Sequence, residues 1–234
     1  MEQSPRVLGV MAKQPLPGLV KTRLAAETSP EWAARVAAAF LADSLDRLAS
    51  IEAHRVLVYA PREAEAFFSR LARGRFSLIP QVEGDLGQRM AAFFSSFPAF
   101  ANKAQDVMVK AVLVGLDSPT LPLSYVEEAF VKLQHADVVL GPATDGGYYL
   151  VGCARRLPPI FENIEWSQPT VLEDTVTLLK DTECRLGLLP PWYDVDTLND
   201  WRMLSGHLAA LRRAGVNPGL PCTEALTLAP DSGQ

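Results

Sequence analysis

The chain has 234 residues, of which 48% are hydrophobic and 21% charged, and its formal net charge is −5. This length is typical of one α/β domain that needs no disulfide to stabilise its core. A negative net charge without a long basic run disfavours a nucleic-acid binder. Because the apolar stretch at the N-terminus is too short for a secretion signal, and no run approaches the length of a membrane span, about 18 apolar residues, we expect a cytoplasmic protein.

Short apolar runs alternate with amphipathic stretches along the chain. In chain order, strands are predicted at Val7–Met11, Arg55–Tyr59, Phe76–Pro80, Ala111–Gly115, Asp137–Leu140 and Tyr148–Val151. Helices are predicted at Glu31–Ser50, Arg62–Ala72, Leu86–Phe97 and Asn199–Arg213, and two more open near Ser124 and Thr170. This alternation predicts an α/β fold with one mostly parallel, doubly wound sheet and helices on both faces. The continuous apolar run Ala111–Gly115 is expected near the middle of the sheet.

Several of the predicted helices carry start signals. Ser29 precedes the first as an N-cap, and Asp85 opens another with Gln88 three residues later. Ser124–Glu127 and Thr170–Glu173 match the capping-box pattern, in which two side chains satisfy each other's backbone amides. Each of these four positions therefore predicts a helix N-terminus.

No linker, internal repeat or low-complexity segment interrupts the chain. We therefore expect a single domain over residues 1–215. Residues 216–234 are rich in Pro, Thr and small residues, and we expect them to lie loosely on the surface as a tail.

The loop after the first predicted strand is basic. Ligands of open α/β sheets bind beyond the carboxyl ends of the strands, so these loops are the place to search for a site. Between Gln3 and Ala26 the chain carries no acid and four cations, which are Arg6, Lys13, Lys21 and Arg23. Lys and Arg match phosphate oxygens, so the loop favours a phosphate-bearing ligand. The alternative is a solvated basic loop whose path is fixed by its prolines.

A glycine-containing turn follows the third predicted strand. Gly84 and Gly87 permit close approach of a ligand to the backbone, and a helix N-terminus follows, which favours anions. Arg89 adds a cation. The alternative is a helix capped by Asp85 that follows an ordinary turn.

An aspartate follows the most apolar predicted strand. Asp117 is held in the turn Gly115–Pro122, and a carboxylate buried at such a place would need a partner charge or a metal. Mg²⁺ takes one or two protein carboxylates and completes its shell with water and phosphate oxygens. The turn therefore favours a metal site, and the alternative is an aspartate that bonds turn amides.

Two further acidic segments follow in the chain. Asp145-Gly146-Gly147-Tyr148 places an acid, two flexible residues and an aromatic ring after a buried strand, although Asp-Gly-Gly is also a good hairpin turn. Asp194 and Asp196 lie on the same side of an extended segment, where a metal would relieve their repulsion. The alternative for this last segment is that Thr197 caps the following helix together with Asp200, and both interpretations can hold.

Five stretches together resemble one family. They are Pro17–Leu24, Gly84–Met90, Gly115–Pro119, Gly141–Leu150 and Asp194–Thr197. In this order and spacing they resemble the GT-A-type nucleotide-diphospho-sugar transferases. More narrowly they are similar to a bacterial branch of glycosyltransferase-like proteins, largely uncharacterised, some of which are linked to arsenosugar biosynthesis. The likeness extends to about Arg213.

The resemblance implies a Rossmann-like (GT-A) nucleotide half followed by an acceptor half within one domain. Phosphate binding would fall to Lys13, Lys21 and Arg23. Base or ribose contacts would fall to the turn that contains Gly84, Gln88 and Arg89. Mg²⁺ or Mn²⁺ would bind Asp117, helped by Asp196 or Asp194. The sugar or acceptor would meet Gly146, Gly147, Tyr148 and Trp166.

The motifs also depart from those of relatives on the same fold. Asp117 is a lone acid, with Gly115 and Pro119 two residues to either side, whereas many glycosyltransferases carry a two-acid Asp-x-Asp motif. The Gly-x-Gly-x-x-Arg loop of sugar nucleotidyltransferases is absent. Lys21-Thr22-Arg23-Leu24 instead is similar to a motif of the 2-phospholactate guanylyltransferases.

These patterns predict a metal-dependent transferase that uses a nucleotide-sugar donor and a small-molecule acceptor. Asp117 would hold the metal, and Asp145 would orient or deprotonate the acceptor hydroxyl. The alternatives are a nucleotidyltransferase and a non-catalytic nucleotide-binding domain, and three acids beside phosphates argue against the latter. The oligomeric state is left open.

Overall fold

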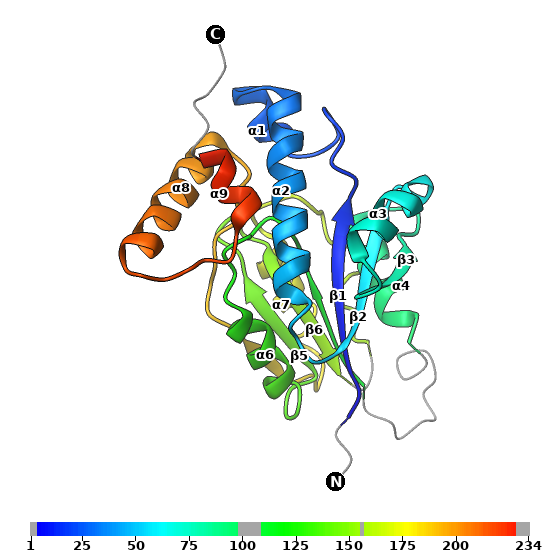
Figure 1. Ribbon diagram of the computed structural model, residues 1–234. Helices are drawn as coiled ribbons and strands as arrows, with labels where there is room; N and C mark the ends of the chain where they lie inside the picture. The colour runs from blue at the N-terminus through cyan, green and yellow to red at the C-terminus, as the bar shows by residue number, and fades with distance from the viewer. Residues whose placement is uncertain (1–3, 98–108, 155–156, 228–234) are drawn as a thin grey trace.

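The computed structural model describes residues 4–97, 109–154 and 157–227, and a seven-stranded sheet in the order β3-β2-β1-β4-β6-β5-β7 forms its centre (Figure 1). The strands are Arg6–Lys13 (β1), His54–Ala60 (β2), Ser77–Pro80 (β3), Lys110–Val114 (β4), Val138–Pro142 (β5), Tyr148–Ala154 (β6) and Leu186–Leu188 (β7). All of them run parallel except β6, which pairs antiparallel with β4 and β5. The mostly parallel sheet with β4 at its middle is thereby confirmed.

Helices cover both faces of the sheet. On one face lie Pro30–Leu48 (α2), Glu65–Ala72 (α3) and Leu123–Lys132 (α6), with a 3-10 turn at Arg62–Ala64 before α3. Their apolar side chains, such as Leu45, Phe68 and Phe130, pack in one cluster with the sheet. On the other face, Leu86–Ser95 (α4) contributes Phe93 and Phe94 to a second cluster, which the helix Val171–Thr177 (α7) joins. Burial on both sides explains why β4 is apolar from Ala111 to Val114.

The helix start signals are only partly as predicted. The Ser29 side chain accepts a hydrogen bond from the Trp32 amide at 3.1 Å, and Asp85 and Gln88 form a reciprocal capping box. The two other predicted boxes are wrong. Pro122, with φ −61°, is the N-cap of α6, so this helix begins before Ser124 could cap it. Thr170 has a helical backbone, whereas a capping side chain requires an extended one.

Three helices that lie beside the sheet form a third cluster with α2. They are Thr22–Glu27 (α1), Leu198–Arg213 (α8) and Pro221–Thr227 (α9). The cluster buries Leu24 of α1, Trp201 of α8 and Leu220, which directly precedes α9. In place of the loose tail expected after Gly215, residues 220–227 therefore pack against the domain. The remainder of that expected tail, residues 228–234, lies outside the described residues.

Asp43 of α2 anchors α9, and its replacement tests that packing. The buried Asp43 carboxylate accepts hydrogen bonds from the amides of Cys222 (3.1 Å) and Thr223 (2.8 Å) and from the Thr223 hydroxyl (2.7 Å). Because Asp43→Ala leaves buried donors unpaired, we expect the free energy of unfolding in urea to fall by about 2 kcal/mol. Asp46→Ala, on the same helix, removes only an exposed pair with Arg75 and is the control. Equal denaturation midpoints for the two variants would contradict an anchoring role.

No helix among the described residues is long and apolar enough to cross a membrane.

Candidate functional site

A cavity of about 720 Å³ opens beyond the carboxyl ends of β1 and β4. The chain runs outward from β1 through β2 to β3 and then returns to β4 on the other side of β1. The strand order therefore reverses between β1 and β4, which is where open α/β sheets bind ligands. Because β6 is antiparallel, its first residue, Tyr148, reaches the same edge and lines the cavity.

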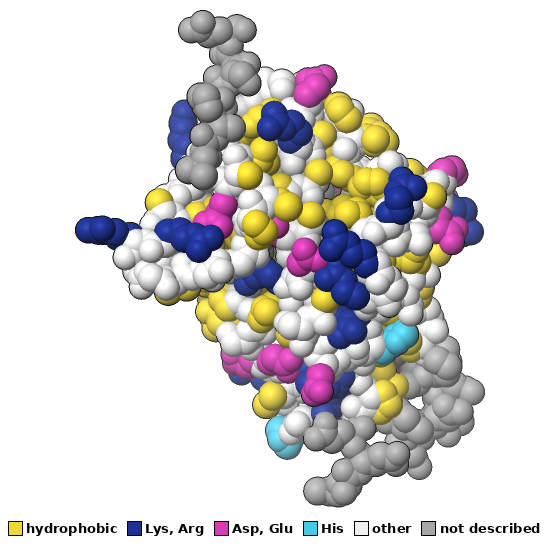
Figure 2. All heavy atoms as spheres, in the orientation of Figure 1, with side chains coloured by type: hydrophobic (Ala, Val, Ile, Leu, Met, Phe, Trp, Pro, Cys, Tyr) yellow, Lys and Arg dark blue, Asp and Glu magenta, His cyan; other side chains and the backbone are white. Residues whose placement is uncertain are grey.

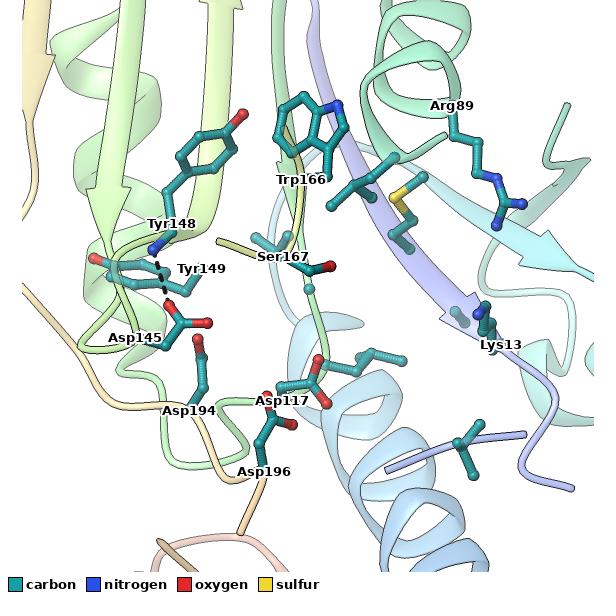
Figure 3. A pocket seen from close by; sticks show the side chains of 18 of the residues that line it. Lys13, Arg89, Asp117, Asp145, Tyr148, Tyr149, Trp166, Ser167, Asp194 and Asp196 are labelled. Atoms are coloured by element: carbon teal, nitrogen blue, oxygen red, sulfur yellow. Dashed lines mark hydrogen bonds between the residues drawn. The ribbon is translucent and has the colours of Figure 1, made fainter. Parts of the chain in front are cut away.

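Four aspartates line one side of this cavity (Figure 3). Asp117 follows β4, Asp145 lies between β5 and β6, and Asp194 and Asp196 precede α8. Backbone hydrogen bonds hold these segments together, from the Val195 amide to the Asp117 carbonyl at 2.9 Å and from the Thr144 amide to the Trp192 carbonyl at 3.0 Å. The structure thus places the four predicted acids together, although the Asp117 side chain is 55% exposed rather than buried.

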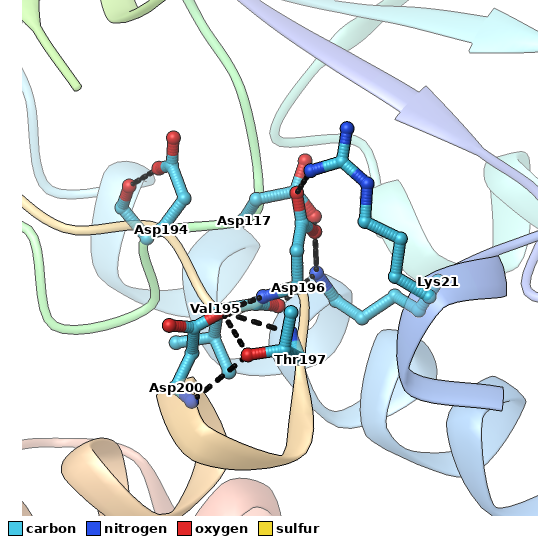
Figure 4. Close-up of polar contacts among 9 residues, drawn as sticks. Lys21, Asp117, Asp194, Val195, Asp196, Thr197 and Asp200 are labelled. Atoms are coloured by element: carbon cyan, nitrogen blue, oxygen red, sulfur yellow. Dashed lines mark hydrogen bonds and ion pairs between the residues drawn. The ribbon is translucent and has the colours of Figure 1, made fainter. Parts of the chain in front are cut away.

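Lys21 lies between two of these acids (Figure 4). Its ammonium donates to the Asp117 carboxylate, to the Val195 carbonyl at 2.7 Å and to the Asp196 carboxylate at 3.3 Å. An ammonium has three N–H donors, so this set accounts for all of them. The Asp117 side chain accordingly accepts from Lys21, and not from a turn amide as the alternative interpretation required.

The Lys21 ammonium is buried as well as paired. Only 4% of its side chain is exposed. Burial alone would lower the pKa of Lys21, but the charges of Asp117 and Asp196 outweigh it and hold the pKa above its usual value. In this arrangement the Lys21 ammonium neutralises carboxylates, and its predicted contact with phosphate stays a prediction.

The pKa of Asp194 is shifted by its surroundings. Burial raises the pKa of Asp194 to about 7, with the nearby charges of Asp117, Asp145 and Asp196 adding to the rise. The hydrogen bond that Ser118 donates to the Asp194 carboxylate acts in the opposite direction. At neutral pH this side chain is thus divided between its charged and neutral forms.

We expect Asp194→Asn to stabilise the protein in a pH-dependent manner. The pKa of Asp194 is about 7 in the folded chain, whereas an aspartate in the unfolded chain has its ordinary value of about 3.9. Stability therefore falls as pH rises between these values, because the unfolded chain loses the proton first. The amide removes this cost and still accepts from Ser118, so the variant should melt several degrees higher at pH 8 and much less so at pH 5. Thermal melts with a chelator check this, and equal shifts at both pH values would contradict it.

Two of the predicted cations face the acids across the cavity, and a third lies beside Asp196. Figure 3 places Lys13 and Arg89 on the opposite side from the four aspartates. The Arg89 guanidinium is oriented by two hydrogen bonds that it donates, to the Gly84 carbonyl oxygen at 2.9 Å and to the Gln81 side-chain oxygen at 3.4 Å. Arg23 is 58% exposed, and its guanidinium lies 3.9 Å from Asp196. The Arg23 side chain is therefore exposed and only distantly paired, so an anion can reach its guanidinium.

Two of the residues predicted to contact ligand, Gln88 and Gly146, lie outside the cavity lining and have structural roles. The Gln88 side chain accepts from the Asp85 amide at 3.0 Å within the capping box, and Gln88 does not line the cavity. Gly84 does line it, and its φ of +118° lets the chain turn beside Gln88. Gly146, also outside the lining, has φ +92°, and a Cβ there would lie 2.0 Å from the Pro169 carbonyl oxygen.

The Asp145 turn is both a hairpin and a cavity wall. The Gly147 amide donates to the Asp145 carboxylate at 2.9 Å, and the Ala143 amide donates to the Gly147 carbonyl at 3.0 Å. The turn joins the antiparallel pair β5 and β6, as the hairpin interpretation predicted. Asp145 and Gly147 nevertheless line the cavity, so the two interpretations are compatible.

Tyr148 and Trp166 form an aromatic part of the cavity wall. Their ring centroids lie 6.4 Å apart with the planes nearly perpendicular. Burial raises the pKa of the Tyr148 hydroxyl above its usual range. Both residues were predicted, whereas Ser118, Gln81 and the lining residue Ser167 were not. Only Gln81 offered a signal, since it directly follows a predicted strand.

The site fits a divalent cation of the Mg²⁺ type better than a metal held entirely by protein. In the described part of the chain, no three His, Cys, Asp or Glu side chains form a group that could hold a metal by themselves. Asp117 and Asp196 nevertheless contact one and the same cation, the Lys21 ammonium. Mg²⁺ needs only one or two protein carboxylates when phosphate oxygens and water supply the rest of its shell.

Comparison with known proteins gives a close similarity over nearly the whole chain. The family described as "Uncharacterized protein conserved in bacteria (DUF2064)" matches residues 44–168. No curated protein matches the sequence. Among solved structures, that of a putative nucleotide-diphospho-sugar transferase from Desulfovibrio desulfuricans G20 has a TM-score of 0.80 and 32% identity, and the match covers 96% of this chain and 97% of that one.

Two more distant structures share the fold. The 4-diphosphocytidyl-2C-methyl-D-erythritol synthase from Anaerococcus prevotii DSM 20548 is 8% identical, with a TM-score of 0.55, and the match covers 88% of this chain and 99% of that one. A homologue of the Mycobacterium tuberculosis protein Rv0371c, from Mycobacterium sp. strain JC1, is 14% identical, with a TM-score of 0.52, and the match covers 89% of this chain and 98% of that one. Identities this low show the fold alone. That fold is a single Rossmann-like α/β domain of the GT-A type, as the resemblance implied.

Proposed function

We propose that this chain is a transferase that uses a nucleotide-diphospho-sugar donor and a divalent cation. The premise is its family, because the chain belongs to the bacterial protein family DUF2064. The similarity to the Desulfovibrio protein supports the donor class. The proposed metal is Mg²⁺ or Mn²⁺ on Asp117 and Asp196, and the proposed acceptor is a small molecule.

One observation supports this proposal above the others. Asp117 and Asp196 share a cation at the mouth of a cavity whose opposite side carries Lys13 and Arg89. A diphosphate would be attracted by the basic side and repelled by the aspartates. A divalent cation between the carboxylates and the phosphates resolves this conflict, since it neutralises both.

The residues around the cavity then take defined roles. The metal would neutralise charge that develops on the leaving diphosphate. Arg23 would donate to the same phosphate oxygens, a contribution that grows as their charge increases during reaction. Asp145, exposed beside this position, would orient the acceptor hydroxyl and take its proton.

The mouth of the cavity offers apolar surface for a base. Leu19 and Leu86 line the cavity and are 64% and 43% exposed. Figure 2 shows apolar side chains gathered over the upper part of the molecule, on the side to which β1 points in Figure 1. Exposed leucines of this kind can cover the face of a nucleobase while the phosphates extend toward Arg23.

Nucleotidyl transfer is the second candidate. Lys21-Thr22-Arg23-Leu24, similar to the motif of the 2-phospholactate guanylyltransferases, opens α1 directly at the cavity. The two reactions differ in which bond breaks, and the same cations would stabilise either leaving group. A third candidate, a nucleotide-binding domain without activity, gives no role to Asp145.

Product analysis distinguishes these candidates. The protein is incubated with Mg²⁺ or Mn²⁺ and a panel of nucleotide sugars or nucleoside triphosphates. Glycosyl transfer, or slow hydrolysis of the donor, releases a nucleoside diphosphate, whereas nucleotidyl transfer releases pyrophosphate. Release of nucleoside diphosphate is the expected result. If no nucleotide raises the melting temperature in a thermal-shift screen with either metal, the proposal is wrong.

A further inference from the structure

Lys21 is held in an unusual conformation at the point where two acids meet. Its backbone is left-handed, with φ 45° and ψ 49°, at the residue before α1. Such a conformation is uncommon outside glycine and is retained where surrounding contacts determine it. The contacts here are those of the ammonium, which is held by Asp117, Asp196 and the Val195 carbonyl and lies 5.1 Å from the centre of the Phe40 ring.

These contacts join segments that are far apart in the chain. Lys21 lies on the loop after β1, Asp117 on the loop after β4, and Asp196 on the segment before α8. Without a cation between them, the two carboxylates would repel each other. The Lys21 ammonium, a positive charge of the chain itself, therefore keeps the two carboxylates close to each other on the acidic side of the cavity.

The same place cannot hold the ammonium and a metal together. A divalent ion bound to Asp117 and Asp196 would occupy the space between their carboxylates and would repel the ammonium beside it. Lys21 has a flexible four-carbon stem. The loop before it includes Gly18, which has a φ of +77° and no neighbouring atoms within 4 Å of where a Cβ would lie. The side chain can thus leave, and the cavity into which it would move is where phosphates would lie.

We propose that Lys21 is a built-in counter-ion that competes with the divalent cation for Asp117 and Asp196, and that cation binding releases the ammonium into the cavity toward the phosphates. This inference rests on the proposed metal-dependent function. It assigns Lys21 a part in organising the site before the metal binds, and a phosphate contact only afterwards.

Calorimetric titration with Mn²⁺ alone, without nucleotide, tests the competition. Lys21→Met keeps the length of the side chain and removes its charge, so it should bind Mn²⁺ about tenfold or more tightly than the parent, since a close competing cation is gone. Lys13→Met is the matched control. Lys13 lines the same cavity but faces the acids from the opposite side, so its loss should change Mn²⁺ affinity by less than about threefold, because a separated exposed charge is screened.

A second measurement uses the unaltered protein, in case Lys21→Met does not fold. Lysines are acetylated with an amine-reactive ester, and the extent at Lys21 is read by peptide mass spectrometry with and without saturating Mg²⁺. Lys21 should be protected in the metal-free protein and several-fold more reactive with Mg²⁺, while Lys13 should not change. Unchanged Lys21 reactivity at a metal concentration that calorimetry shows to be saturating would overturn the inference.

The outcomes separate this inference from the proposed function. Equal Mn²⁺ affinity of the parent and Lys21→Met would overturn the counter-ion role and leave metal-dependent transfer standing. Mn²⁺ binding by Lys21→Met but not by the parent would support the counter-ion role strongly. Absence of Mn²⁺ binding by both proteins, with and without a nucleoside diphosphate, would overturn the inference and the metal dependence together.

Discussion

Asp117→Asn is expected to lower metal-dependent transfer by roughly a hundred- to a thousandfold, the usual loss when one element of transition-state charge stabilisation is removed. The amide is a far weaker ligand than the carboxylate for a hard cation, so metal-dependent nucleotide binding should weaken with it. The Asp117 side chain is 55% exposed, so the fold should remain intact. Initial rates, calorimetry with and without Mg²⁺, and circular dichroism would measure the three effects.

Asp46→Asn is the matched control for this variant. Asp46 is also 55% exposed and paired with one cation, Arg75, but it lies on α2 outside the cavity lining. It should retain the activity of the parent. Unchanged Mg²⁺-dependent nucleotide affinity in Asp117→Asn would show that Asp117 has only a structural role.

Arg23→Ala is expected to weaken binding of a nucleoside diphosphate by about ten- to a hundredfold. A charged contact formed away from bulk water contributes about 1.5–3 kcal/mol, and 1.4 kcal/mol is a factor of about ten. Arg23 is the better candidate for this contact in the metal-free protein, because it is exposed and only distantly paired, at 3.9 Å from Asp196, whereas the Lys21 donors are then all used. Calorimetric titration with the diphosphate measures the effect.

Three comparisons make this prediction specific. A nucleoside without phosphates should bind Arg23→Ala almost as well as the parent. Added salt should weaken diphosphate binding more in the parent than in the variant, since the screened contact is the one that was lost. Arg35→Ala, on an exposed position of α2, should behave as the parent. Equal losses for nucleoside and diphosphate would instead indicate a disturbed fold.

The sequence predicted most of the sheet and its helices because their patterns are local. The apolar run Ala111–Gly115 and the cap at Ser29 identify β4 and α2 without knowledge of any partner. The short elements were missed for the opposite reason. β7, Leu186–Leu188, is a strand only because it pairs with β5, and α9 is stabilised by Asp43 from a distant part of the chain.

The candidate site was predicted where it depends on topology. Parallel strands end at one edge, so Lys13 at the end of β1 and the loops that carry Asp117 and Asp145 approach one another. Which charges pair within that edge is decided by tertiary contact. The sequence therefore could not predict that Lys21 pairs with Asp117 and Asp196, whereas the helix start at Asp85, with Gln88 three residues later, is a local pattern that the sequence does show.

A crystal structure with Mn²⁺ and a nucleoside diphosphate tests the central claim most directly, because anomalous scattering locates the metal independently of the rest of the density. The account predicts one Mn²⁺ between Asp117 and Asp196, the diphosphate bridging this ion to Arg23, and the Lys21 ammonium displaced from both carboxylates. A nucleotide bound outside this cavity, or inside it with Lys21 still between the two aspartates and no metal there, would contradict the account.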